Sequence, residues 1–276
     1  MGPAPIRMTR KMRRTTPPAK RRVRRIFTLP IPYKRRASNL EDRVLRLNVR
    51  ARMTCLRRHA LLTGAMLALG SFLGLADGSI QHSWLGVDQA TRGAVGLTHL
   101  PELDTPMRTL TLLGSRAGLI SLIALAIVSL WGYRRCWALA LPVIMAGTGG
   151  LQLVAKWAVN RPRPNLADWG YPSGHVLSLV VFFGLVAYLL RTSRASRGWR
   201  VLGGGACAGI VLVVAFSRLY LDVHWFTDVI GGFALGLAYL LLTIWLVEAL
   251  RRRRVNALAV LPADDSLPAH EAPIPA

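Results

Sequence analysis

Residues 201–250 read VLGGGACAGIVLVVAFSRLYLDVHWFTDVIGGFALGLAYLLLTIWLVEAL. The stretch holds two long apolar runs, over 201–217 and 229–249, with a short polar segment between them. A helix that crosses a bilayer needs about 20 predominantly apolar residues. The stretch therefore predicts two membrane helices that are joined by a polar turn.

Four similar runs precede this stretch along the chain. They cover residues 60–76, 109–132, 137–155 and 176–190, and 52% of all 276 residues are hydrophobic. Small residues inside such runs, glycine above all, allow membrane helices to approach one another closely. The chain is therefore predicted to be all-α, an integral membrane bundle of about six transmembrane helices within residues 59–250.

The net charge of +23 is concentrated at the N-terminus, where residues 1–58 hold 19 Lys and Arg residues against two acids. This composition predicts a basic, largely disordered cytoplasmic segment. Beside a membrane helix, such a segment is attracted to anionic lipid headgroups by about 1 kcal/mol per charge, so membrane lipids are favoured over nucleic acid as its partner. Residues 251–276 predict a basic stop followed by a disordered cytoplasmic tail.

The arginines also predict which side of the inner (cell) membrane each loop faces. With six spans and both termini in the cytoplasm, the arginine clusters at 134–135, 191–200 and 251–254 all lie inside, as the positive-inside rule requires. The long loop over 77–108, whose basic and acidic residues nearly balance, then faces the periplasm or exterior.

Three polar clusters lie at the ends of the apolar runs, and all fall on this outer side. The clusters are Lys156, Arg163 and Pro164; Pro172, Ser173, Gly174 and His175; and Ser217, Arg218, His224 and Asp228. Ionisable residues beside a membrane are costly unless they act together. We therefore expect the clusters to converge on one site, whereas the neighbouring Arg161 is expected to be a surface or lipid-headgroup contact.

The basic members of these clusters suit a phosphate group. Arg163 and Arg218 can each donate two parallel hydrogen bonds to phosphate oxygens, and Lys156 adds a compact charge. Ser173 and Gly174 lie just ahead of a predicted helix start, where backbone N–H groups point toward an anion. These five residues are therefore predicted to bind phosphate.

The remaining members suit covalent catalysis. His224 and Asp228 are four residues apart, which places them on one face of a helix. Asp228 can hold one ring nitrogen of His224 and leave the other as a nucleophile toward phosphorus. His175 can protonate the leaving alkoxide and then activate water. The predicted course is a phosphohistidine intermediate without metal or other cofactor, since the sequence offers no carboxylate cluster suited to a metal.

Together the three clusters resemble the three signature motifs of the type 2 phosphatidic acid phosphatase superfamily. The resemblance covers residues 156–228 directly, and the six-span layout extends it to about 60–250. It implies His224 as nucleophile, His175 as acid, Asp228 as the orienting carboxylate and the basic residues as phosphate ligands. It also implies hydrolysis of a lipid phosphate or diphosphate, with undecaprenyl diphosphate favoured over phosphatidic acid and phosphatidylglycerol phosphate. The superfamily also contains vanadate-dependent haloperoxidases, but these are soluble and larger, so six spans argue against that activity.

Other interpretations stay open at this point. Lys156 and Arg163 could simply snorkel at a helix end, and residues 172–174 could be a plain turn and N-cap. The chain could also be a transporter or scaffold that binds phospholipid headgroups without hydrolysis, and its basic tail could bind nucleic acid in either case. The pair of His224 and Asp228 favours the hydrolase, because binding alone needs no nucleophile. The sequence predicts no oligomeric state.

Overall fold

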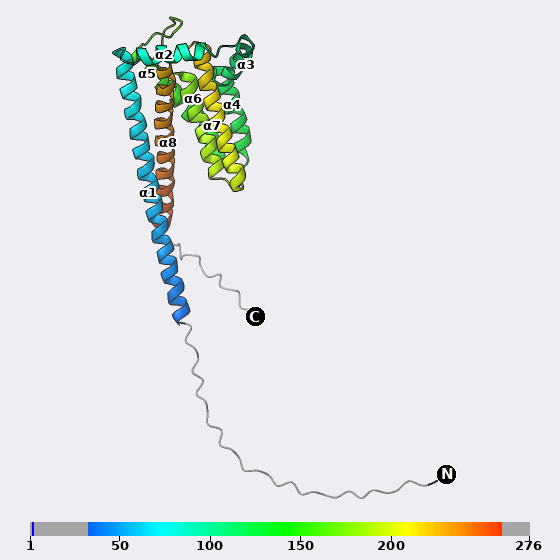
Figure 1. Cartoon of the computed structure of the whole chain (residues 1–276). Coiled ribbons are helices and arrows are strands. Elements are labelled where there is room, and N and C mark those ends of the chain that lie inside the picture. The colour runs from blue at the N-terminus through cyan, green and yellow to red at the C-terminus, as the bar shows by residue number, and fades with distance from the viewer. Residues whose placement is uncertain (1, 3–32, 261–276) are drawn as a thin grey trace, which may run out of the picture. The chain divides into compact units, whose positions relative to one another are not determined.

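The computed structural model describes residue 2 and residues 33–260, with side chains over 53–253. Within this part of the chain all regular structure is helical (Figure 1). The helices are α1 Tyr33–Ile80, α2 Leu85–Gly96, α3 Pro101–Thr111, η1 Leu112–Gly114, α4 Arg116–Trp131, α5 Arg135–Val159, α6 Gly174–Arg191, α7 Arg197–Tyr220 and α8 Phe226–Val260. Two compact units make up the chain, Met1–Ala51 and Arg52–Ala276, and the helix bundle lies in the second.

Among the described residues, five helices are long and apolar enough to cross a membrane, and the pair formed by α3–η1 and α4 counts as a sixth span if it is taken as one. This confirms the predicted all-α membrane bundle, and the chain is an integral membrane protein. The helices extend beyond the expected spans at both ends: α1 begins at Tyr33, inside the segment predicted to be largely disordered, and α8 continues to Val260. The predictions for residues 3–32 and 261–276 lie outside the described residues.

The second expected span, over 109–132, is broken in the structure. The two helical parts meet at an angle of 56° around Ser115. Ser115 is the N-cap of α4, where its Oγ accepts a hydrogen bond from the Gly118 N–H at 3.1 Å. A serine side chain satisfies the unpaired N–H groups of a helix start in this way. Arg116 is therefore the first residue of α4 rather than a residue inside a continuous span.

Helix α6 lies between α7 and α8 and packs against both. The approach of α8 is close because of two glycines one turn apart. A Cβ atom on Gly232 would lie 2.7 Å from the carbonyl oxygen of Ser173, and one on Gly236 would lie 3.0 Å from that of Leu177. Membrane helices use small residues for such contacts. The crossing brings the start of α8 beside the start of α6, where two of the three polar clusters lie.

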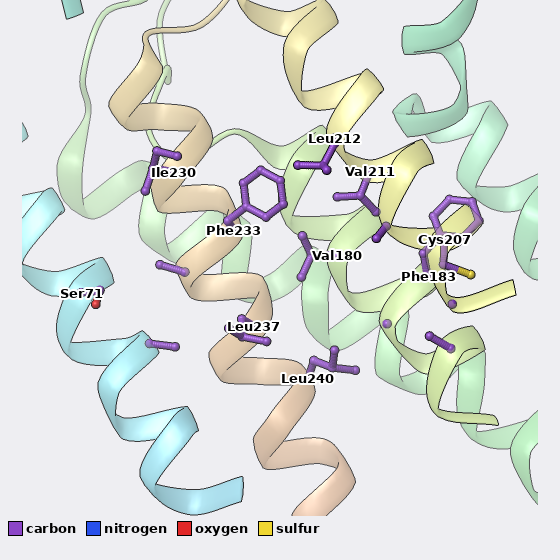
Figure 2. A pocket seen from close by; sticks show the side chains of 16 residues that line it. Ser71, Val180, Phe183, Cys207, Val211, Leu212, Ile230, Phe233, Leu237 and Leu240 are labelled. Atoms are coloured by element: carbon purple, nitrogen blue, oxygen red, sulfur yellow. The ribbon is translucent and has the colours of Figure 1, made fainter. Parts of the chain in front are cut away.

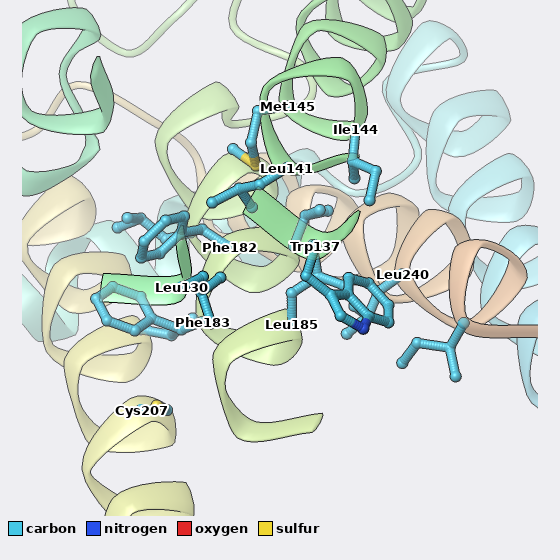
Figure 3. Packing of buried hydrophobic residues seen from close by; sticks show 14 of the residues in the cluster. Leu130, Trp137, Leu141, Ile144, Met145, Phe182, Phe183, Leu185, Cys207 and Leu240 are labelled. Carbon is cyan, nitrogen blue, oxygen red and sulfur yellow. The ribbon is translucent and has the colours of Figure 1, made fainter. Parts of the chain in front are cut away.

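The main hydrophobic cluster holds the other half of the bundle together (Figure 3). It joins the end of α4, the first half of α5 and the middle parts of α6, α7 and α8. Trp137, Phe182, Leu185 and Leu240 are buried members, and Cys207 packs among them as a small apolar residue. The polar clusters thus lie at one end of a bundle whose opposite end is densely packed.

A cavity of about 550 Å³ opens between α1, α6, α7 and α8 (Figure 2). Its lining is apolar apart from Ser71 and Cys207, with Val180, Phe233 and Leu237 among the walls. The lining holds no charged, histidine or tyrosine side chain, so it offers no general acid or base. The predicted site residues do not line this cavity.

The segment between the first two expected spans contains α2 and α3. Helix α2 lies across the end of the bundle at which α5 ends and α8 begins (Figure 1), and it packs against α8 and α7. Helix α3 packs against α7. The Tyr220 hydroxyl at the end of α7 donates to the Leu100 carbonyl oxygen at 2.6 Å and accepts from the Leu100 N–H at 2.9 Å. These contacts hold α2 and α3 over the end that carries the polar clusters.

Candidate active site

The three polar clusters meet at this end of the bundle, around a cavity of about 870 Å³. The predicted site residues that line the cavity are Lys156, Arg163, Gly174, His175, Arg218 and His224. Ser173 and Asp228 are fully buried behind it. The Ser173 N–H donates to the Asp228 carbonyl oxygen at 2.9 Å, so the second and third clusters are joined through the backbone.

Lys156 reaches the cavity from the last turn of α5. The helix ends at Val159, and its C-cap Asn160 adopts the left-handed conformation (φ 44°) and donates its N–H to the Lys156 carbonyl oxygen. Asparagine tolerates this conformation and often ends helices. Lys156 is 5% exposed as a residue. Its ammonium donates to the Trp169 carbonyl oxygen, which holds it at the cavity wall. Arg163 follows on the loop that leads to α6.

Arg218 lies in the last turn of α7, where the helix dipole favours a cation. One guanidinium nitrogen, Nη1, donates to the Thr111 hydroxyl at 2.7 Å, so the end of α3 holds the side chain in place. Sequence reasoning did not identify Thr111, because it lies 107 residues away from its partner.

Three buried donors of the predicted phosphate ligands have no hydrogen-bond partner within the described chain. They are Nε of Arg163, Oγ of Ser173 and Nε of Arg218. An unsatisfied buried donor costs about 1–3 kcal/mol. Donors of this kind, one from each cluster, suit an anion with several oxygens.

His224 and Asp228 form a hydrogen-bonded pair. The Nδ1 atom of His224 lies 3.2 Å from Oδ2 of Asp228, which also accepts the Trp225 N–H at 3.0 Å. With the proton on Nδ1, the other ring nitrogen carries a free lone pair. Burial lowers the pKa of His224 to about 4, although the charge and hydrogen bond of Asp228 act in the opposite direction. The imidazole is therefore neutral at pH 7, as a nucleophile requires.

His175 lies in the first turn of α6 and lines the same cavity as His224. Its ring packs against η1: a Cβ atom on Gly114 would lie 2.7 Å from His175 Cδ2. The glycine at position 174 has a related role, since a Cβ atom there would lie 2.1 Å from the amide nitrogen of Gln152. The absence of a side chain at Gly174 thus makes room for Gln152, a reason that the sequence did not suggest.

The expectation for Arg161 is wrong, because this arginine is buried rather than on the surface. Its exposed fraction is 5%. Nη2 donates to Oδ2 of Asp88 at 2.6 Å, and Nη1 donates to Oδ1 of Asp228 at 3.0 Å and to the Thr227 hydroxyl at 2.7 Å. Asp88 comes from α2 and lies 73 residues from Arg161 in the chain. No local pattern in the sequence connects the two residues.

Arg116 also lines the cavity, beside the predicted phosphate ligands. Over the described side chains, no group of three or more His, Cys, Asp and Glu residues is arranged to hold a metal ion.

Comparison with known proteins identifies the family of the chain. The family model described as the PAP2 superfamily matches residues 137–252. The chain is 31% identical over 192 residues to phosphatidylglycerophosphatase B of Bacillus subtilis, and this alignment covers 66% of this chain and 94% of that protein. It is 40% identical over 93 residues to an undecaprenyl-diphosphatase of Sulfolobus acidocaldarius, and this alignment covers 34% of this chain and 40% of that protein.

Among solved structures, the crystal structure of a transmembrane PAP2-type phosphatidylglycerolphosphate phosphatase from Bacillus subtilis is similar to this fold. Its TM-score is 0.61 at 27% sequence identity, and the match covers 68% of this chain and 96% of that chain. The family model, over residues 137–252, spans all three polar clusters. The similarity extends over 94% of the Bacillus subtilis phosphatase and 96% of the chain in the solved structure. The chain belongs to the PAP2 superfamily.

Proposed function

We propose that the chain is a membrane phosphatase that hydrolyses a lipid phosphate or diphosphate through a phosphohistidine on His224. The observation that carries the proposal is the composition of the cavity along its length. One end holds the cations and the two histidines, and the remainder is lined mainly by apolar residues of α4 and α5. An amphiphile with an anionic head and an apolar chain matches such a cavity.

The length of the apolar part supports a lipid rather than a soluble phosphate ester. The lining residues of α4 run from Arg116 to Ile127. At a rise of 1.5 Å per residue, this face of α4 extends for roughly 16 Å. Facing it, α5 contributes lining residues from Pro142 to Lys156. A hydrocarbon chain can lie between the two helices while its phosphate reaches the polar end.

In the proposed reaction, Nε2 of His224 attacks phosphorus while the bond between phosphorus and the leaving oxygen breaks. His175 donates a proton to that oxygen. The leaving group is the lipid alcohol for a lipid phosphate and the lipid monophosphate for a lipid diphosphate. Water then attacks the phosphohistidine, His175 accepts its proton, and the P–N bond breaks to release inorganic phosphate. Asp228 holds Nδ1–H throughout, which stabilises the positive charge that develops on the imidazole ring.

The cations supply the electrostatic part of the proposed catalysis. Lys156, Arg163 and Arg218 surround the polar end of the cavity, and the Ser173 hydroxyl and the start of α6 lie behind it. Fixed donors that face the transferring phosphoryl group are usually the largest contribution in reactions of this kind.

The substrates to test first are those named for the relatives, phosphatidylglycerol phosphate and undecaprenyl diphosphate, together with phosphatidic acid. The full-length protein in lipid nanodiscs should release inorganic phosphate from at least one of them, with and without EDTA. Glycerol 3-phosphate, which has a phosphate head but no chain, should be a much poorer substrate. Equal turnover of glycerol 3-phosphate would contradict the lipid assignment.

The role of His224 is tested in the same assay. His224→Ala should lower the rate on the order of 10³-fold or more and abolish the phosphoenzyme, which is trapped by an alkaline detergent quench because acid hydrolyses the P–N bond. His59→Ala is the matched control, because His59 is exposed and its ring hydrogen-bonds within α1 to Cys55. A phosphatase rate that survives in His224→Ala would refute the mechanism. Headgroup binding without any phosphate release from the wild-type protein would favour a non-hydrolytic transporter or scaffold instead.

We also propose that the site faces the exterior, because the arginine-rich connections are then cytoplasmic. A membrane-impermeant thiol reagent added to intact cells should label Leu166→Cys, which is 87% exposed on the loop before α6. It should spare Cys136, which is exposed near the start of α5 at the opposite end of that helix. The reverse labelling pattern would overturn the orientation. The basic segment 1–58 is proposed to bind anionic headgroups on the cytoplasmic side.

A further inference from the structure

The most completely bonded carboxylate of the described chain outside the predicted motifs is Asp88 of α2. It is 1% exposed. Its Oδ1 accepts the Thr227 N–H at 2.9 Å, and its Oδ2 accepts the Thr227 hydroxyl at 2.8 Å and Nη2 of Arg161 at 2.6 Å. A buried charge is costly unless it is paired and hydrogen-bonded. Asp88 meets both conditions, and its partners lie directly beside the catalytic pair.

Arg161 connects Asp88 to Asp228. The guanidinium presents Nη2 to Asp88 and Nη1 to Oδ1 of Asp228, at 2.6 Å and 3.0 Å. This contact occupies Oδ1, so Oδ2 is the oxygen that faces His224. A planar, five-donor guanidinium held at two points fixes the direction in which it presents each N–H. The orientation of the Asp228 carboxylate, and through it that of the imidazole, is therefore set from α2.

The charges of the group lead to the same conclusion. Two carboxylates and one guanidinium carry one net negative charge, which remains available to the imidazole ring as it becomes positive during attack on phosphorus. Without the charge of Asp88, Arg161 would pair with Asp228 alone and would offset most of that negative charge. The second carboxylate thus allows Asp228 to be held by an arginine and still to stabilise His224.

We propose that Asp88 is a positioning residue that acts through Arg161 on the Asp228–His224 pair. The inference rests on the proposed phosphatase function and adds to it a role for α2, which lies outside the three motifs. Asp88 does not line the cavity that holds the predicted substrate. Its contribution should therefore affect the chemical step rather than substrate binding.

The test uses Asp88→Asn in the full-length protein in nanodiscs with the lipid phosphate that the wild type hydrolyses best. Asparagine has the same shape, and its Oδ1 can still accept the Thr227 N–H. Its Nδ2 replaces the oxygen that accepts from Arg161, so the substitution removes the charge together with the bond to Arg161. We expect kcat to fall about 10- to 100-fold, as expected for small misplacements of a reacting group. KM should stay within about 3-fold of the wild-type value. If KM rose by as large a factor as kcat fell, the whole site would have lost its structure, and the proposal would be overturned.

A double-mutant cycle provides the decisive measurement. If Asp88 acts through Asp228, then Asp88→Asn should change the residual rate of Asp228→Asn by less than about 3-fold, because interacting residues are not additive. If Asp88→Asn lowered the rate of Asp228→Asn by as large a factor as it lowers the wild-type rate, the proposal would be overturned. Should Asp88→Asn fail to yield folded protein, Thr227→Val carries the test, since it removes a hydroxyl that bonds both Asp88 and Arg161. A Thr227→Val enzyme with the wild-type kcat would then refute the role.

The matched control is Arg92→Gln, one turn further along α2. Arg92 pairs with Asp222 at 2.5 Å, but both side chains are about half exposed, and such surface pairs contribute little. We expect kcat within about 3-fold of the wild type. If Arg92→Gln lowered kcat as much as Asp88→Asn, any contact of α2 would suffice and the specific role would be refuted. Wild-type turnover and its loss in His224→Ala are measured alongside. If the wild type is active and Asp88→Asn has the same kcat, only the role of Asp88 is refuted. If the wild type releases no phosphate, the proposed function itself is refuted.

Discussion

Replacing Arg161 by methionine should destabilise the folded protein more than any single change to an exposed ion pair. The substitution removes three hydrogen bonds, of 2.6, 2.7 and 3.0 Å, and leaves the buried carboxylates of Asp88 and Asp228 without their shared cation. Methionine retains much of the apolar stem, so little packing is lost. Removal of one partner from a buried ion pair costs about 3–5 kcal/mol.

The expected loss translates into a measurable change in melting temperature. For a domain of this size, 1 kcal/mol corresponds to about 2–4 °C, so Arg161→Met should lower the apparent Tm by roughly 6–20 °C. The assay is tryptophan fluorescence of the protein in detergent micelles, heated at one fixed scan rate because unfolding of such proteins is often irreversible.

Two further variants make this prediction refutable. Arg92→Gln breaks an ion pair whose side chains are 48% and 43% exposed. It should lower the free energy of unfolding by less than about 1 kcal/mol. Adding Asp88→Asn to Arg161→Met removes one of the unpaired charges and should recover part of the lost stability. Equal Tm shifts for Arg161→Met and Arg92→Gln, or a double variant less stable than Arg161→Met alone, would show that the buried cation does not hold these carboxylates.

Two other predictions concern pH and the position of His175. Because the folded-state pKa of His224, about 4, lies below its ordinary value of 6.5, the neutral ring contributes stability above pH 6.5 that is lost as pH falls toward 4. The His224 imidazole of the free protein should likewise titrate with a midpoint near pH 4 in NMR spectra of histidine-labelled protein, and a midpoint near 6.5 would contradict a buried neutral imidazole. Gly114→Ala should lower kcat about 10- to 100-fold by displacing His175, whose Cδ2 would lie 2.7 Å from the new Cβ. Gly150→Ala, which meets nothing within 4 Å, should retain the wild-type rate, and equal losses in the two variants would refute this positioning.

The membrane class and the composition of the site could be predicted from the sequence because both depend on local patterns. An apolar run long enough to cross a bilayer is visible without any partner, and all six predicted runs correspond to helices of the bundle. Arg163, His175 and His224 were recognisable because each lies in a short motif at the end of such a run, on the side where basic residues are otherwise rare.

The tertiary structure alone decided which groups surround that site. Burial of Arg161 depends on carboxylates 67 and 73 residues away, and the contact between Gly114 and His175 joins two different helices. The free-energy cost of burying a charge, or of adding a side chain at a glycine, depends on the atoms that surround the residue in space. Hydropathy and charge along the chain do not show which atoms those are. The sequence therefore determined where the chain meets the membrane and which polar residues lie at the ends of its helices, whereas packing of α2 and η1 against the bundle determined how those residues are held.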